Sequence, residues 1–169
     1  KPGAFYGWPY AYLGQNEEPR RKGESPEAVK KTIEPDVVLG AHASVMDFVF
    51  YTGKSFPAKY RNGVFIVFHG SWNRAPEPQG GYNVTFQPLS NGKAAGDFEI
   101  FAGGFAGKTP LMNPGDALAR PNGIAMAPDG SMYAMGSFVN AGGDPTADYL
   151  VRYDPATGDW SGIGSNGAG

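Results

Sequence analysis

A pattern of turns and strands occurs twice along the chain, and this repeat constrains the fold more than any other feature. Gly63 opens the apolar run VFIVF, and Gly130 opens SMYAMGSF 67 residues later (130 − 63). Tyr82 and Tyr149 begin the next two runs, YNVTFQPL and YLVRY, and are also 67 residues apart (149 − 82). Recurrence at a fixed offset indicates a repeated supersecondary unit.

Short apolar or alternating runs separated by turn dipeptides fill most of the chain, which predicts an all-β fold. The chain holds 26 Gly and 15 Pro among 169 residues, so turns are abundant. Residues 25–32 are typical of a short helix, because Ser25 suits an N-cap and Pro26 suits the first helical position. This helix falls within residues 15–34, which we interpret as a loop insert.

Each unit is interpreted as four consecutive antiparallel strands. They are expected at about 45–51, 64–69, 82–89 and 97–103, and again at 123–127, 131–138, 149–153 and, weakly, 159–164. Such units are typical of β-propeller blades, and a sandwich of two sheets is the alternative. Because a propeller needs at least about four blades, residues 1–169 are expected to be part of a single larger propeller domain.

Strand direction decides at which edge of each unit a loop emerges. In an up-and-down unit, the loop between the second and third strands and the loop that leads to the next unit share one edge. That edge receives His42, His69, Trp72, Asn73, Arg74, Arg120 and Asn122. Arginine forks bind carboxylates or phosphates, and tryptophan offers a flat stacking surface. Since loops at one edge often carry function, we expect a flat, negatively charged ligand there.

Composition excludes several other classes of function. A net charge of −2 with scattered basic residues argues against nucleic acid as a partner. The absence of cysteine excludes disulfides and thiol chemistry. No apolar run approaches the ~18 residues of a membrane helix, so no transmembrane segment is expected. Two histidines without a suitably spaced third ligand make a weak zinc site, and the metal ligands stay unknown.

Four segments resemble the soluble glucose/sorbosone dehydrogenases, which are six-bladed propellers that use pyrroloquinoline quinone (PQQ). They are FYGWPY (5–10), AHASVMDFVFYTGKSFPAKYRNGVFIVFHGSWNR (41–74), GGYNV (80–84) and RPNGIAMAPDGSMY (120–133). The resemblance is to the C-terminal half of the family and leaves out residues 15–34 and the tail after Gly158. It implies that the chain supplies about two to three blades of a six-bladed propeller.

The resemblance implies that the whole protein oxidises a sugar (an aldose, sorbosone or a related polyol) by hydride transfer to PQQ, held with calcium. Arg120 matches a cofactor-binding arginine of the family, and Asn122 stands where some members carry a second arginine. Arg74 lies in a loop where members place Lys or Arg. His69 and Trp72 are expected beside the same cofactor. On the substrate side, we expect His42 and Asn73.

The family's catalytic base is a histidine of its N-terminal half, so the resemblance implies no catalytic residue in this chain. The isolated chain is therefore expected to be inactive. The implied partners are a sugar, the upstream half of the propeller and an electron acceptor such as a cytochrome or a quinone. The expected location is periplasmic or secreted. The alternatives are a propeller that binds a glycan or a protein partner through the same edge and, more weakly, a lactonase-type hydrolase.

Overall fold

The structure is a computed structural model that describes residues 2–139 and 144–163. Two compact units divide the chain: unit 1 is Lys1–Leu39 and unit 2 is Gly40–Gly169. In unit 1, the strands β1 (Ala11–Tyr12) and β2 (Asn16–Glu17) pair antiparallel, followed by the 3-10 helix η1 (Pro19–Arg21) and the helix α1 (Pro26–Lys31). The helix α1 begins at a proline, as the pattern at its N-terminus predicts.

Unit 2 begins with an antiparallel sheet in the order β3-β4-β5-β7. Its strands are β3 (Val45–Phe50), β4 (Gly63–Phe68), β5 (Asn83–Ser90) and β7 (Glu99–Ala102). The short strand β6 (Lys93–Ala94) pairs only with the end of β5, and the 3-10 helix η2 (Ala58–Tyr60) lies between β3 and β4. All four strands of the first predicted unit are therefore present.

The second sheet of unit 2 has the order β8-β9-β10-β11 and is also antiparallel. It contains β8 (Arg120–Met126), β9 (Met132–Ser137), β10 (Leu150–Tyr153) and β11 (Trp160–Gly162), and the 3-10 helix η3 (Pro114–Asp116) precedes it. The weakly expected strand at 159–164 is β11. The all-β prediction is confirmed, and the described residues form two sheets of the same strand order.

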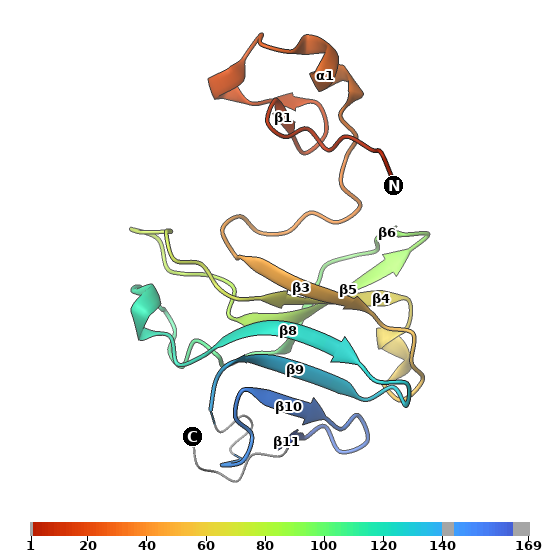
Figure 1. The fold of residues 1–169 in the computed structure, drawn as a ribbon, viewed down its shortest axis with the longest axis vertical. Coiled ribbons are helices and arrows are strands. Elements are labelled where there is room, and N and C mark those ends of the chain that lie inside the picture. The colour runs from red at the N-terminus through yellow and green to blue at the C-terminus, as the bar shows by residue number, and fades with distance from the viewer. Residues whose placement is uncertain (1, 140–143, 164–169) are drawn as a thin grey trace. The chain divides into compact units, whose positions relative to one another are not determined.

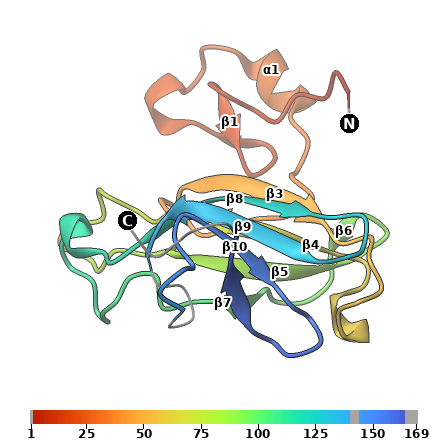
Figure 2. The same cartoon turned by 60° about the horizontal axis from the view of Figure 1, so that its bottom comes forward.

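The two sheets pack on each other most closely along β3 and β8, which run side by side in the same direction (Figures 1 and 2). At one end of this pair, the Ile124 amide donates to Asp47 Oδ2 at 3.0 Å. At the other end, Ser55 Oγ donates to the Asp129 carbonyl at 2.9 Å. Between the outer strands, large rings fill the space. Phe101 on β7 contacts both Tyr153 and Trp160.

The strand order recurs, but the offset of 67 residues does not carry over to the faces of the sheets. Phe65 and Met132 are 67 residues apart (132 − 65) and face each other in the core between the sheets. Equivalent side chains of two stacked, similarly directed sheets would instead point the same way. Because strand side chains alternate between faces, a shift of one residue exchanges them. The interpretation that the repeat stays in register is thus corrected.

The buried hydroxyl of Thr85 on β5 provides a test of the sheet's packing. Within the part of the chain that the structure describes, Thr85 Oγ1 is buried without a hydrogen-bond partner, and such a group lowers stability. Thr85→Val should therefore raise the free energy of unfolding by about 1 kcal/mol, measured by urea denaturation. The control is Thr146→Val, which removes the hydrogen bond from Thr146 Oγ1 to Asp144 and should lower stability. A loss of stability in Thr85→Val would contradict the burial.

Candidate functional site

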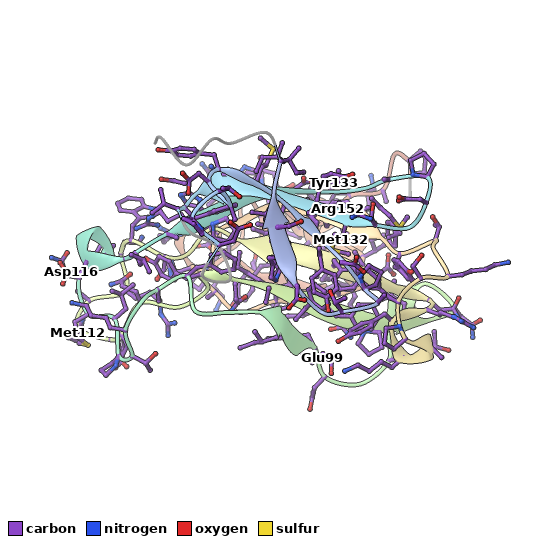
Figure 3. All side chains as sticks on the ribbon, turned by 90° about the horizontal axis from the view of Figure 1, so that it is seen from below. Glu99, Met112, Asp116, Met132, Tyr133 and Arg152 are labelled. Atoms are coloured by element: carbon purple, nitrogen blue, oxygen red, sulfur yellow. The ribbon has the colours of Figure 1, made fainter. Side chains whose placement is uncertain are left out.

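The loops predicted to share one edge do so. This edge, called the loop edge, comprises residues 40–44, 69–82 and 103–119 and the described part of 138–149, and it lies on the left of unit 2 in Figure 1. Met112 and Asp116 mark it in Figure 3. His69, directly after β4, has Nδ1 3.2 Å from the Pro121 carbonyl at the start of β8. Antiparallel pairing within each sheet brings these ends together.

Arg120, the first residue of β8, joins two loops of this edge. Its Nη1 donates to the Gly70 carbonyl at 3.2 Å, and its Nη2 donates to the Pro114 carbonyl at 2.9 Å. The guanidinium also lies over the Tyr82 ring, with Cζ 4.9 Å from the ring centroid. An arginine carries five N–H donors, so these two hydrogen bonds orient the fork without using all of its donors.

A cavity of about 360 Å³ adjoins Arg120, within the size range of small-molecule sites. It is lined by Trp72, Pro114, Gly115, Ala117, Leu118, Ala119, Arg120 and Ser137. Trp72 is 70% exposed, which leaves its indole available for stacking. The structure thus brings a guanidinium and an open aromatic face, both predicted from the sequence, to one cavity.

Ser71 closes the base of the loop that carries Trp72. Its fully buried Oγ donates to Gln79 Oε1 and accepts from the Gly80 amide, both at 2.8 Å. The Gln79 amide donates to the Leu111 carbonyl at 2.7 Å, and the Tyr82 hydroxyl donates to the Ser71 carbonyl. Sequence reasoning missed Ser71, Gln79 and Tyr82, although their position between a buried strand and the pair Gly80-Gly81 was a usable signal.

Removing the Ser71 hydroxyl should loosen this loop. Ser71→Ala leaves the Gly80 amide and the Gln79 carboxamide without their buried partner, which costs about 1–3 kcal/mol. We expect a loss of that size in urea denaturation and faster proteolysis within residues 72–78. The matched control is Ser90→Ala at the exposed end of β5, which should change little. Equal effects of the two variants would show that the loop does not depend on Ser71.

The other predicted residues lie on the loop edge but outside the cavity lining. Arg74 lies beside Gly80, where an added Cβ would be 2.4 Å from Arg74 Nη1. His42 and Asn73 are exposed. Asn122 is exposed in the bulge between Pro121 and Gly123. The Arg120 cavity therefore unites only part of the predicted set.

Asp47 on β3 is a further residue that the sequence analysis missed. Its Oδ1 accepts from the Phe48 amide at 2.8 Å, while Oδ2 accepts from Ile124 on β8. The half-buried carboxylate therefore holds the first turn of β3 against the β8 bulge that follows Arg120. A single acidic residue inside the apolar run VMDFVFY was the available signal.

Among residues 2–139 and 144–163, no group of three or more His, Cys, Asp or Glu side chains is placed to hold a metal ion. Within the same described residues, no helix is both long and apolar enough to cross a membrane.

The fold and the cavity define an all-β protein of repeated four-stranded sheets with a ligand-sized site at one loop edge. The chain belongs to the TrAA12-like family, which matches residues 13–138. An uncharacterized protein of Borreliella burgdorferi is 33% identical over 138 residues, which cover 80% of this chain and 34% of that protein. Thus the chain spans about a third of this relative's length.

Two solved structures have a similar fold. The iodide structure of Trichoderma reesei Carbohydrate-Active Enzymes Family AA12 has a TM-score of 0.56 at 19% identity and covers 88% of this chain and 39% of that one. The calcium structure of the same family has a TM-score of 0.54 at 19% identity and covers 88% and 38%. These findings agree broadly with the resemblance drawn from the sequence. Placement in the C-terminal half of the glucose/sorbosone dehydrogenases stays a prediction.

Proposed function

We propose that the chain is part of a quinoprotein dehydrogenase that oxidises a sugar, such as an aldose, sorbosone or a related polyol, by hydride transfer to PQQ. The observation that carries the proposal is the pairing of Arg120 and Trp72 at one cavity. Membership of the TrAA12-like family and a fold like that of a carbohydrate-active enzyme support it. When bound, PQQ supplies the acceptor for the hydride.

The residues at the cavity fit part of this flat tricarboxylate. Arg120 is preoriented by two carbonyls and a ring, so its remaining donors bind one carboxylate. Trp72 covers a face of the ring system. Arg74, Asn122 and His69 are proposed as further cofactor contacts from the same edge. On the substrate side, the proposal retains His42 and Asn73.

The rest of the site belongs to parts of the protein outside this chain. The chain covers about a third of the relative that it matches, and we propose that it is the C-terminal part of a six-bladed propeller. The upstream half supplies the catalytic base and the calcium ligands. The described residues of this chain gather no acidic cluster for such an ion. The proposal includes a cytochrome or quinone as electron acceptor and a periplasmic or secreted location.

Sugar-dependent dye reduction by the natural polypeptide that contains this chain tests the proposal. We expect reduction of an artificial electron acceptor that requires added PQQ and calcium and that stops after chelation. Residues 1–169 alone should show no activity. Sugar oxidation that proceeds without the quinone, or a protein that fails to oxidise any aldose after reconstitution, would refute it.

The second candidate is a propeller that binds a glycan without redox chemistry. Its supporting observation is the exposed indole of Trp72, because open aromatic rings also stack on sugars. Glycan binding by the natural polypeptide that persists without PQQ, together with a lack of dye reduction, would favour this function.

A further inference from the structure

The first sheet of unit 2 has an outer face that is turned away from the second sheet. Side chains alternate along β3, so Asp47 and Val49 face the second sheet and their neighbours face outward. The outward side chains of the sheet include Met46, Phe48, Phe50, Val64, Ile66, Phe68 and Ile100. We call this set the outer face.

Large apolar groups of the outer face are open to solvent. Phe48 is 57% exposed, Phe50 is 54% exposed and Ile100 is 63% exposed. Phe48 and Phe50 contact each other edge to face, with ring centroids 5.8 Å apart. Soluble proteins rarely expose contiguous apolar surface of this kind, and such a patch marks an interaction surface.

The opposite face of the same sheet shows which kind of partner fits. There, Phe65, Val67, Val84 and Phe86 pack against Ile124 and Met132 of a second four-stranded sheet. The outer face offers the same kind of uncharged aliphatic and aromatic side chains from the same strands. Because units of a repeat contact their neighbours on both sides, the contact on one face indicates an equivalent contact on the other.

We propose that the outer face is the docking surface for a further four-stranded antiparallel sheet, supplied by the same polypeptide outside residues 1–169. The length of the relatives supports this occupant, since the chain covers only 34% of one and 39% of another. The docked sheet packs with its first strand beside β3 and in the same direction, as β8 packs beside β3 on the other side. The inference rests on the apolar face and the repeat and does not depend on the quinone.

Photo-crosslinking in the natural polypeptide tests the identity of the occupant. The photoreactive amino acid p-benzoylphenylalanine is placed at position 48, and the captured peptide is identified by mass spectrometry. We expect an intramolecular crosslink to a strand outside residues 1–169. Position 112, on the loop edge, is the control and should not capture the same peptide.

Three other outcomes would overturn the proposal. Capture of residues 1–39 would show that unit 1 covers the face, and capture of a second molecule would show a dimer interface. Labelling by water alone would show that the face is open. None of these outcomes bears on dye reduction, so failure here is distinguishable from failure of the proposed function.

A substitution gives an independent measure. Phe48→Ser should raise the unfolded fraction of the natural polypeptide at least about tenfold, because burial of a phenylalanine side chain stabilises by about 1.5–3 kcal/mol. The matched control, Met112→Ser, replaces a half-exposed residue of the loop edge and should change it little. Equal unfolded fractions for the two variants would overturn the proposed docking.

Discussion

Replacing Arg120 with alanine is expected to weaken the binding of PQQ by the natural polypeptide about a hundredfold. The physical reason is that truncating one partner of a hydrogen-bonded charge pair costs about 2–5 kcal/mol. Arg120 is oriented for a carboxylate by the Gly70 and Pro114 carbonyls. Titration of the polypeptide with PQQ, followed by calorimetry, measures the change in the dissociation constant.

Two control variants separate the contact from a general effect of charge. Arg61→Ala removes an exposed arginine from the connection between β3 and β4, at the edge opposite the cavity, and should leave binding unchanged. Arg120→Lys keeps the charge but loses the fork, and should bind with intermediate affinity. Circular dichroism checks that each variant is folded. Unchanged affinity in folded Arg120→Ala would remove Arg120 from the quinone site.

Phe65→Ala should lower the free energy of unfolding of unit 2 by about 3–5 kcal/mol, because it opens a cavity at the centre of the aromatic core. Phe65 is fully buried. Its ring contacts those of Tyr51, Phe56, Tyr60, Phe86 and Phe101. Urea denaturation, monitored by far-UV circular dichroism, measures the loss.

The conservative variant Phe65→Leu shows whether the lost volume causes the effect. Leucine fills part of the space, so the loss should be clearly smaller, about 1–2 kcal/mol. If alanine and leucine have the same small effect, the two sheets do not pack on this ring, and the observed core is wrong.

The sequence was sufficient to predict the strands because they are short apolar runs bounded by turn glycines. Chain order and antiparallel pairing then placed the loops at one edge without knowledge of any contact. The faces of the strands could not be predicted in the same way. A shift of one residue exchanges the faces, and bulges interrupt both β3 and β8.

The candidate site was predictable to a similar extent. Arg120 and Trp72 were expected on the loop edge from residue type and order, and they line one cavity. That the Arg120 fork lies over Tyr82, and that Ser71 holds the loop through Gln79, depends on how two loops fold against each other. Asp47 was missed because its apolar neighbours indicate only a strand, not the hydrogen bond to Ile124.

The position of the quinone in a crystal structure of the natural polypeptide, loaded with PQQ, tests the central claim most directly. The account predicts a PQQ carboxylate within hydrogen-bonding distance of the Arg120 guanidinium and the ring system against Trp72. A quinone bound elsewhere, with the Arg120 cavity filled by solvent, would contradict it.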